Sequence, residues 1–431
     1  MNCAGLKYLQ ALAPFGMTGD LKNMERLLDV FEHPERKFQT IHVVGTDGKG
    51  STAFYLSRIL SAHGISAGLY TSPHLVNVRE RIRLDNAPIS EEDLNRLLLQ
   101  VRDVAEQTQT RISFFEALTL ACFLYFAEKN VGVAVIEAGL GGRLDSTRTA
   151  CGKRAVLTSI GMEHTEILGN TEREILYEKM GILSAGATLF AGGISPELVR
   201  DAENFSKSLS AKVVFPPVVE NLEVPNVGHH YAENASLSLA VACDFLGIAF
   251  DEEKARDALR HALWVGRMQK LRTPEGKLRW ILDGAHNPHA VKRLAETLEL
   301  EFPKQKLACV FGALRDKDLN EMLNLLAPHI SVWHVTRTPY ERFREVGDIS
   351  SELQTRGCQV GYSGEMSRPF LDKVQEISDG PVLITGSLYM IGSAIYQLRD
   401  DFEDLSFFRG MELTESETHG KQKNESTLKR I

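Results

Sequence analysis

The apolar residues of this chain fall into short uninterrupted runs and longer periodic stretches. Runs such as 41–44 and 131–136 carry no charge, which is typical of strands buried on both faces of a sheet. Stretches such as 91–108 and 113–129 repeat apolar residues at helical spacing. Strands that alternate with helices indicate an α/β protein with parallel sheets. The other predicted strands are 66–70, 155–160, 278–282, 307–311, 331–335 and 381–385, and the other predicted helices are 21–31, 171–179, 288–298, 319–326 and 388–398.

The alternation of strands and helices is interrupted at W-V-G-R-M-Q, residues 264–269, and then starts again. A chain of 431 residues is too long for one hydrophobic core, so two domains are expected. We place them at residues 1–265 and 266–409. Residues 410–431 are polar and aperiodic, which predicts a disordered tail. The alternating segment 79–84 fits either an edge strand or a mobile loop.

A glycine-rich turn joins the first buried strand to the helix that follows it. The sequence is I-H-V-V-G-T-D-G-K-G-S-T over residues 41–52. In such a turn, backbone N–H groups converge on an anion, and the helix N-terminus adds partial positive charge. Lys49 is placed to reach the β- and γ-phosphates, and Ser51 or Thr52 can offer a hydroxyl to Mg²⁺. The loop departs from the common pattern because Gly50 follows the lysine, and the alternative is a glycine turn that binds nothing.

Polar groups follow other predicted strands at equivalent positions. Glu137 ends the strand at 131–136, and His164 follows the strand at 155–160. Loops at the carboxyl ends of parallel strands emerge at one edge of a sheet, so these groups should meet the phosphate loop in one cleft. A carboxylate there suits Mg²⁺ binding in an NTPase, although it can also be a solvent-facing acid. With Ser72, His164 would complete a second, oxygen-rich metal site, whereas a loop histidine alone is usually polar surface.

Two further groups have an ordinary structural alternative. Lys179 ends a helix that begins near Thr171, and from the pattern alone it is a solvated lysine. Asp283 follows the first strand of the second domain in L-D-G-A-H-N-P, which suggests a ligand-binding edge that faces the first domain. Asn287 can instead cap the next helix, with Pro288 at the first helical position. Capping and ligand binding can coexist.

Composition narrows the remaining functions. The chain is 43% hydrophobic and 25% charged, as globular proteins are, and its net charge of −8 is spread without a basic stripe that would bind nucleic acid. We see no apolar run approaching about 18 residues and no basic–apolar leader, so neither a membrane span nor a signal peptide is expected. The six cysteines are far apart and form no C-x-x-C, which predicts reduced, mostly buried thiols in a cytoplasmic protein.

The chain carries ten ordered motifs between about residues 6 and 398. They are G-T-D-G-K-G-S-T, T-S-P-H-L with R-E-R-I-R-L, F-F-E-A-L-T, E-A-G-L-G-G-R-L-D-S-T, S-I-G-M-E-H-T, E-K-M-G-I, G-R-M-Q, L-D-G-A-H-N-P-H-A, F-G-A-L-R-D-K-D and T-G-S-L-Y. Together they resemble the folylpolyglutamate synthase/dihydrofolate synthase family of the Mur ligase superfamily. The resemblance implies an N-terminal P-loop ATPase-like domain with a parallel sheet and a smaller, Rossmann-like C-terminal α/β domain.

The resemblance implies an ATP-dependent amide ligase with ATP and Mg²⁺ as cofactors. Such an enzyme adds L-glutamate to a pterin or folate carboxylate through an acyl phosphate. The expected protein is a cytoplasmic monomer of folate biosynthesis and one-carbon metabolism. It would act both on 7,8-dihydropteroate, as a dihydrofolate synthase, and on reduced folates, as a folylpolyglutamate synthase.

Three other functions remain open at this point. The first is a folylpolyglutamate synthase that does not act on dihydropteroate. The second is a non-catalytic nucleotide-binding homologue, which the retained lysines, carboxylate and histidine of the site disfavour. The third is a cell-wall ligase acting on a UDP-sugar peptide, which is disfavoured because the chain starts near its phosphate loop.

The resemblance also assigns roles to individual residues. Lys179 matches the family's carbamylated lysine, in which a carboxylate-like group that can approach metal replaces the ammonium, so the solvated alternative is set aside. The catalytic residues are then Lys49, His164 and Lys179; the ATP-binding residues are Gly48, Lys49, Gly50, Ser51, Asn234, Arg267 and Asp283; the metal ligands are Ser51, Ser72, Glu137 and His164; and the pterin-binding residues are Ser113, Phe114, Phe115, Glu116, Leu144, Asp145 and Ser146.

Three positions depart from the family pattern. Asp47 replaces an asparagine of the phosphate loop and puts a negative charge near the triphosphate, which would weaken ATP binding or favour an extra metal contact. Val265 replaces a proline before G-R and would loosen the connection between the two domains at residues 264–269, called the hinge below. Tyr231 replaces a glutamine in the segment before Asn234. None of the three removes a principal ligand, so we expect an active enzyme.

Overall fold

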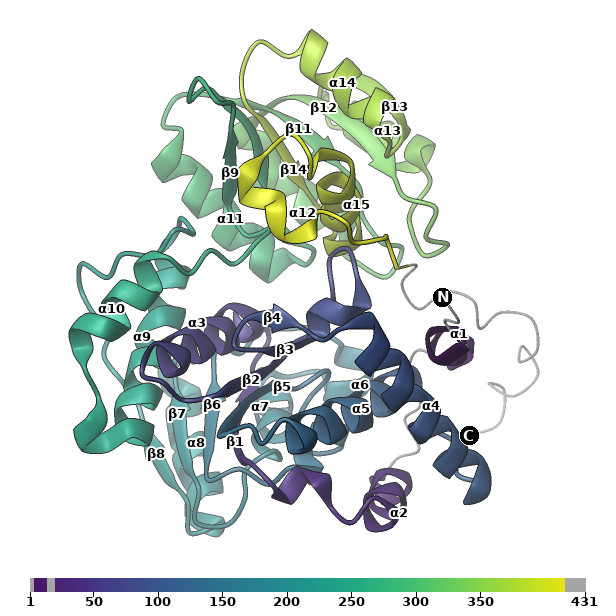
Figure 1. Ribbon diagram of the computed structural model, residues 1–431. Helices are drawn as coiled ribbons and strands as arrows, with labels where there is room; N and C mark the ends of the chain where they lie inside the picture. The colour runs from purple at the N-terminus through teal and green to yellow at the C-terminus, as the bar shows by residue number, and fades with distance from the viewer. Residues whose placement is uncertain (1–3, 14–19, 415–431) are drawn as a thin grey trace.

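Two α/β units make up the protein, in a computed structural model that describes residues 4–13 and 20–414 (Figure 1). The N-terminal unit is built on an eight-stranded sheet and the C-terminal unit on a six-stranded sheet. In Figure 1 the C-terminal unit, coloured green to yellow, lies above the N-terminal unit. We propose the division between residues 265 and 266, in the connection that joins the two sheets.

The sheet of the N-terminal unit has the strand order β4-β3-β2-β5-β1-β6-β7-β8. Its pairing is parallel except between β2 and β3 and between β3 and β4. The parallel strands therefore end at one edge, where the loops that carry polar groups emerge. The strands are β1 Gln39–Val44, β2 Ala67–Tyr70, β3 Ile82–Leu84, β4 Ala87–Pro88, β5 Val133–Glu137, β6 Arg154–Leu157, β7 Thr188–Ala191 and β8 Lys212–Val214.

The sheet of the C-terminal unit has the order β13-β12-β11-β14-β10-β9 and is parallel apart from β9, which pairs antiparallel with β10. The turn that contains Asp283 follows β10, and the Asp283 N–H donates to the Ile384 carbonyl of the neighbouring strand β14. The strands are β9 Gln269–Arg272, β10 Leu278–Leu282, β11 Leu307–Phe311, β12 Ile330–Arg337, β13 Val360–Glu365 and β14 Val382–Thr385.

Helices cover both faces of each sheet. Strand β5 illustrates why, because Val133 and Val135 pack with the core on one face while Ala134 and Ile136 pack with the core on the other. The helices are α1 Ala4–Ala11, α2 Lys22–Val30, α3 Lys49–Ala62, α4 Glu91–Gln107, α5 Phe114–Glu128, α6 Thr165–Leu168, α7 Glu172–Met180, α8 Pro196–Ser208, α9 His229–Leu246, α10 Glu252–Arg260, α11 Pro288–Glu301, α12 Leu319–Leu326, α13 Val346–Thr355, α14 Arg368–Ile377 and α15 Leu388–Leu398. The 3₁₀ turns are η1 Pro34–Arg36, η2 Val78–Arg81, η3 Ser146–Thr149, η4 Gly247–Ala249, η5 Ala327–His329 and η6 Glu403–Phe408.

The structure confirms the predicted α/β class, and β10, β11, α12 and α15 have the predicted bounds. Two strands of the second sheet were not predicted. β9 begins at Gln269, inside the predicted linker, and has the sequence Q-K-L-R, whereas β13 reads V-G-Y-S-G-E. Neither carries a continuous apolar run, because each pairs along one side only, at an edge of the sheet. Segment 79–84 divides between η2 and the short strand β3.

Helix α9 with η4, His229–Ala249, is long and apolar enough by composition to cross a membrane, with a mean hydropathy of 1.2. Within the molecule, 44% of that stretch is buried. Leu237, Val241 and Ala242 pack in the same core cluster as Leu56 and Ile59 of α3. The helix therefore behaves as a core helix of the N-terminal unit.

Two expectations about the surface need correction. Cys122 and Cys309 are buried as predicted, but Cys151 and Cys243 are exposed. Residues 410–414, at the start of the predicted tail, lie against the molecule: Met411 is buried, and the N–H of Thr414 donates to the Val76 carbonyl at 2.8 Å. Cys3 and residues 415–431 lie outside the described residues.

Candidate active site

A cavity of about 580 Å³ lies between the two units, at the carboxyl ends of the N-terminal strands. It is lined by almost all of the residues that were singled out from the sequence. Two of them are elsewhere: Phe114 is buried under the Arg81 guanidinium, and Lys179 lines a neighbouring void of about 30 Å³. The predicted residues that line the cavity are Gly48, Lys49, Gly50, Ser51, Ser72, Ser113, Phe115, Glu116, Glu137, Leu144, Asp145, Ser146, His164, Asn234, Arg267 and Asp283.

The phosphate loop runs from the end of β1 to the start of α3. Gly48 has a φ of 82°, and a Cβ there would lie 2.7 Å from Asn234 Oδ1, so both conformation and space require glycine. Asn234 Nδ2 donates to Ser51 Oγ at 2.9 Å, which joins α9 to the first turn of α3. Lys49 Nζ donates to the Gly45 and Thr46 carbonyls at 3.0 and 2.9 Å.

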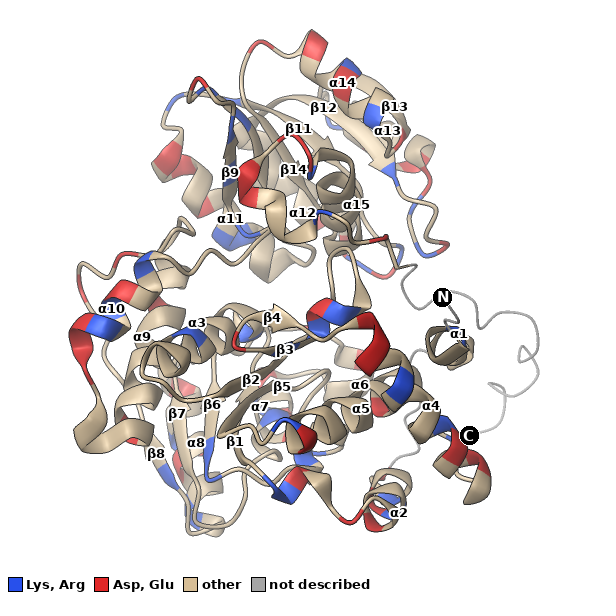
Figure 2. Cartoon of the chain, viewed as in Figure 1, with Lys and Arg blue, Asp and Glu red and all other residues tan. Residues whose placement is uncertain are grey.

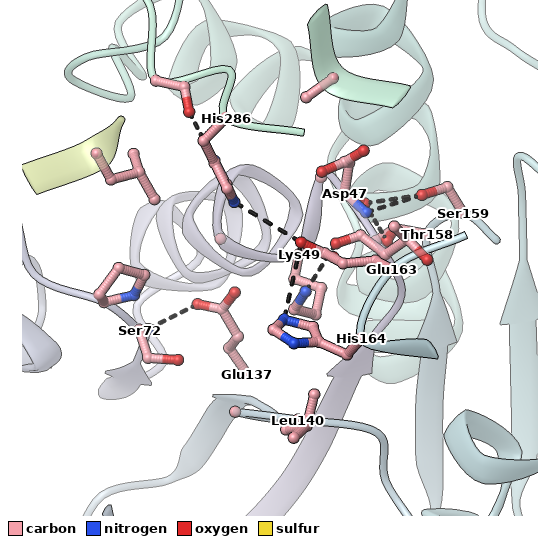
Figure 3. Close-up of a pocket in the computed structure, with 18 of the residues that line it drawn as sticks. Asp47, Lys49, Ser72, Glu137, Leu140, Thr158, Ser159, Glu163, His164 and His286 are labelled. Atoms are coloured by element: carbon pink, nitrogen blue, oxygen red, sulfur yellow. Dashed lines mark hydrogen bonds and ion pairs between the residues drawn. The ribbon is translucent and has the colours of Figure 1, made fainter. Parts of the chain in front are cut away.

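Glu137 supplies a buried carboxylate at the end of β5, beside the phosphate loop (Figure 3). Its Oε2 accepts the Ser72 N–H at 2.8 Å. Burial raises the pKa of Glu137 to about 7, against the lowering effect of Lys49 and of the Ser72 hydrogen bond. Ionising a buried carboxylate costs free energy, and a bound cation would offset that cost. The burial of Glu137 therefore suits a metal-binding role.

Lys179 is buried in the last turn of α7, so it is not a solvated helix lysine. Its Nζ donates to the Gly45 carbonyl at 2.7 Å, directly under the phosphate loop. Burial lowers the pKa of Lys179 to about 7, and the charge of Lys49 adds to this effect. At neutral pH a large share of this amine is therefore neutral and nucleophilic.

His164 lines both the cavity and the small void beside Lys179, and its backbone φ is 50°. A non-glycine residue in this left-handed region is strained, and such strain is concentrated at functional sites. Its Nε2 lies 3.8 Å from Glu163 Oε1. Burial lowers the pKa of His164, which favours the neutral imidazole that a metal requires.

The donor set fits Mg²⁺ that is shared with a nucleotide. Within residues 4–13 and 20–414, no three His, Cys, Asp or Glu side chains are grouped so as to hold a metal by themselves. Mg²⁺ is commonly bound by one or two carboxylates together with hydroxyls, water and substrate phosphates. Glu137 and the Ser51 hydroxyl, beside the phosphate loop, meet that description.

A polar network that the sequence did not reveal connects the phosphate loop to the C-terminal unit. His289 Nδ1 of α11 lies 2.5 Å from Asp47 Oδ2, and Asn287 Nδ2 donates to Glu163 Oε1 at 3.1 Å. Burial alone would raise the pKa of Asp47, but the hydrogen bond and charge of His289, together with Lys49, hold it below its usual value. The partners are more than 100 residues apart in the chain, so no local pattern could have indicated them.

The predicted pterin segments form one wall of the cavity. Glu116 Oε2 accepts the Ser113 N–H at 2.8 Å, which makes a capping box at the start of α5. Asp145 Oδ2 accepts the Leu140 N–H at 2.9 Å. The Phe115 ring covers Gly139, where a Cβ would lie 2.6 Å from it. This wall therefore combines a fixed backbone with an aromatic face, as a flat heterocycle requires.

Arg267 and Asp283 lie on the opposite wall, at the hinge. Both carboxylate oxygens of Asp283 accept backbone N–H groups, Oδ2 from Met268 at 2.8 Å and Oδ1 from Ala285 at 2.9 Å. The Arg267 guanidinium lies on Gly284, where a Cβ would come within 2.4 Å of it. Asp283 thus shapes the hinge, and Gly284 leaves room for the arginine.

Comparison with known proteins places this site in a class. A family model described as "Mur ligase, glutamate ligase domain" matches residues 266–388. The dihydrofolate synthase/folylpolyglutamate synthase of Bacillus subtilis (strain 168) is 32% identical over 420 residues, covering 89% of this chain and 96% of the relative.

Solved structures agree with this match. Folylpolyglutamate synthase from Thermotoga maritima has a TM-score of 0.79 at 30% identity, over 93% of this chain and 97% of that one. A bifunctional folylpolyglutamate synthase/dihydrofolate synthase with Mn, AMPPNP and L-glutamate bound has a TM-score of 0.78 at 26% identity, over 91% and 97% of the two chains.

The two-unit fold and the phosphate loop at its cleft, together with these matches, define an ATP-dependent ligase of the Mur ligase type that uses ATP and a divalent metal. Identity to the relatives is spread over almost the whole chain. The chain belongs to the dihydrofolate synthase/folylpolyglutamate synthase family, whose reaction joins glutamate to a folate-type acid.

Proposed function

We propose that this chain is bifunctional, adding L-glutamate first to 7,8-dihydropteroate and then to reduced folates. The observation that carries the proposal is the single cavity, in which the phosphate loop, Glu137 and the aromatic wall at Phe115 face one another. A nucleotide and a pterin carboxylate bound there would meet at the loop. The bifunctional name of the relative at 32% identity supports both activities, whereas the name of the Thermotoga maritima protein supports polyglutamylation alone as the alternative.

The chemistry must turn a poor electrophile into a good one. A carboxylate oxygen of the substrate attacks the γ-phosphorus of ATP, the bond to the β–γ bridging oxygen breaks, and ADP leaves. The amine of L-glutamate then attacks the acyl phosphate carbon, phosphate leaves, and the nitrogen loses a proton. Lys49 would turn from the Gly45 and Thr46 carbonyls to the phosphates, where its charge offsets the charge of the transferred group.

Residues of both units would hold the reactants. Gly48, Gly50 and Ser51 would bind the phosphates through backbone N–H groups, while Asn234 and Arg267 would hold the nucleotide from α9 and the hinge. Bound Mg²⁺, held by Ser51, Glu137, Ser72 and His164, would neutralise charge on the β- and γ-phosphates. The cavity excludes bulk water from the acyl phosphate once both units close on it.

We also propose that Lys179 is carbamylated. Formation of a carbamate needs a neutral amine, and a pKa of about 7 supplies one at physiological pH. The amine adds to CO₂, loses a proton and becomes an anion beside Gly45. With ¹³C-bicarbonate, the wild type should give a carbamate carbonyl signal by NMR that Lys179→Gln lacks, and a spectrum without that signal would contradict the modification.

The proposal also covers where the protein is found, how many chains it forms and which partners it lacks. We propose a cytoplasmic monomer that does not bind nucleic acid. Figure 2 supports the last point, because Lys and Arg are interspersed with Asp and Glu over both units. A single species of one-chain mass in light scattering after size-exclusion chromatography is expected, and a dimer would contradict it.

Release of ADP tests the proposed function directly. The enzyme is given ATP, Mg²⁺ and L-glutamate with dihydropteroate in one reaction and tetrahydrofolate in another. Turnover with both is expected. Turnover with tetrahydrofolate alone would identify a polyglutamylation enzyme, and turnover with neither would overturn the proposal and direct attention to Asp47 and the hinge.

A further inference from the structure

The side chain of Asn226, which lies between β8 and α9, connects the hinge to the N-terminal unit through hydrogen bonds. Asn226 is 2% exposed and makes four hydrogen bonds. Its Nδ2 donates to the carbonyls of Trp264 at 2.8 Å and Arg267 at 2.6 Å. Its Oδ1 accepts the Trp264 N–H at 2.9 Å and the Tyr55 hydroxyl at 3.0 Å. All donors and acceptors of an amide can thus be engaged at once, which few residue types could imitate.

Two of the three partners of Asn226, Tyr55 and Trp264, lead to the phosphate loop. Tyr55 belongs to α3, the helix that begins at Lys49. The indole of Trp264 packs against Phe54 of the same helix, with ring centroids 4.9 Å apart and ring planes tilted by 33°. It also covers Gly50, where a Cβ would lie 3.1 Å from Trp264 Cζ2. The start of the hinge therefore rests on the helix whose first turn holds the phosphates.

The third partner of Asn226 is Arg267, which connects Asn226 to the other side of the cavity. Asn226 holds the backbone of Arg267, whose guanidinium lines the cavity against Gly284. One residue further on, the N–H of Met268 is held by Asp283 of the C-terminal unit. Asn226 and Asp283 thus hold, from opposite units, the carbonyl and the N–H of the single peptide bond between Arg267 and Met268.

We propose that Asn226 is a positioning residue for nucleotide binding, which sets the place of Trp264 and Arg267 relative to the phosphate loop. The inference rests on the proposed role of Arg267 as a nucleotide-binding residue. Asn226 does not line the cavity in the described structure, so it acts through its neighbours and not by contact with substrate. A misplacement of the order of 1 Å far from the reacting atoms can cost about 10²-fold in rate, so the effect should be measurable.

The test compares Asn226→Asp, Asn226→Ala and Tyr55→Phe with the wild-type enzyme. Aspartate has the same shape, but a carboxylate cannot donate to the two carbonyls and would repel them. We expect Asn226→Asp to raise the KM for ATP and the Kd for a non-hydrolysable ATP analogue by about tenfold or more. The KM for the folate substrate should change less than about twofold. Tyr55→Phe should raise the KM and Kd of the nucleotide by a smaller factor. The double variant Asn226→Ala/Tyr55→Phe should have the same KM and Kd as Asn226→Ala, because both single changes remove the bond between Tyr55 and Asn226.

A structural control separates positioning from stability. Asn95 Oδ1 of α4 accepts the Gly5 N–H at 2.8 Å, far from the cavity. Asn95→Ala should lower Tm without changing the KM for ATP. If Asn226→Asp or Asn226→Ala lowers Tm but leaves the KM and Kd of the nucleotide at their wild-type values, the proposal is wrong.

The two proposals fail in different ways. If Asn226→Asp does not fold, Asn226→Ala and Tyr55→Phe carry the same test. If the wild type binds the analogue but releases no ADP with either pterin substrate, the proposed function fails while the binding measurements still decide the role of Asn226.

Discussion

The two walls of the cavity hold their polar groups in different ways. On the N-terminal side, burial displaces to about 7 the pKa values of both Glu137, which lines the cavity, and Lys179, which lies behind the phosphate loop. On the C-terminal wall, both oxygens of Asp283 accept backbone N–H groups, and next to this wall Asn287 Oδ1 accepts the Ala290 N–H to cap α11. At Glu137 and Lys179, burial disfavours the charged form. Burial also raises the pKa of Asp283, but there two backbone N–H groups partly offset the effect and the carboxylate fixes the backbone in return.

This difference between the walls predicts a different role for the residues of each. A side chain whose polar atoms are all hydrogen-bonded to backbone fixes the position of that backbone. A buried ionisable side chain that is only partly bonded in this way is a candidate to bind substrate or metal. We therefore expect the N-terminal wall to carry out phosphoryl transfer and the C-terminal wall to set the geometry in which it happens. Five substitutions separate these roles.

The largest effect is expected at the phosphate loop. Lys49→Ala should lower ADP release by about 10³-fold, because the charge that offsets the transferred phosphoryl group is lost. Lys153→Ala, an exposed lysine just before β6 and at the opposite end of the strands, is the matched control and should keep full activity. Unchanged turnover in Lys49→Ala would overturn the site assignment as a whole.

Exchanging one carboxylate on each wall tests the comparison itself. Glu137→Gln should lower kcat by about 10²-fold, yet keep or raise Tm at pH 8, where the buried carboxylate of the wild type is ionised at a cost. Asp283→Asn should behave in the opposite way. Its amide N–H₂ would face a backbone N–H, so the free energy of unfolding should fall by about 1–3 kcal/mol, while kcat falls less than in Glu137→Gln.

Thermal unfolding and steady-state kinetics on the same samples give both readouts. The comparison between the walls fails if Asp283→Asn keeps its stability and loses more activity than Glu137→Gln.

The pH dependence of stability should reveal Lys179. Its pKa is about 7 in the folded chain and 10.5 as an ordinary lysine, so between these values the unfolded state binds more protons. Stability therefore rises with pH from about 7 to 10.5, by up to a few kcal/mol, and Lys179→Met should lack this part of the rise. Urea unfolding in CO₂-free buffer at pH 7 and 9.5 measures the difference, and parallel curves for the two proteins would contradict the buried neutral amine.

The smallest effect is expected at the contact between the walls. Asp47→Asn keeps a hydrogen-bonding group opposite His289 but removes a negative charge close to Lys49. The KM for ATP should fall by about threefold to tenfold. If the Mg²⁺ requirement rises instead, Asp47 contributes to metal binding and does not merely repel the triphosphate.

The sequence was most informative where local pattern and local structure coincide. The glycine turn, the acid that ends β5 and the buried strands were predictable, because each depends on neighbours in the chain. The meeting of Glu137, His164 and the phosphate loop at one cavity followed from parallel topology alone. The charge state of Lys179 could not follow from pattern, since only packing against Gly45 reveals its burial.

Contacts between distant segments had no signal in the sequence. Asn226 lies in a stretch without periodicity, and its partners Tyr55 and Trp264 are 171 and 38 residues away. The pair of Asp47 with His289 spans 242 residues. Edge strand β13 was missed for a different reason, because an exposed edge needs no apolar run.

We propose that the cavity activates a carboxylate by phosphorylating it, and the transfer of an isotope from the substrate to the released phosphate tests this step. Substrate labelled with ¹⁸O in the reacting carboxylate is turned over with ATP and L-glutamate, and the released phosphate is analysed by mass spectrometry. An acyl phosphate leaves its bridging oxygen on phosphorus, so one ¹⁸O per phosphate is expected. Phosphate that contains no ¹⁸O, at full amide yield, would contradict the claim.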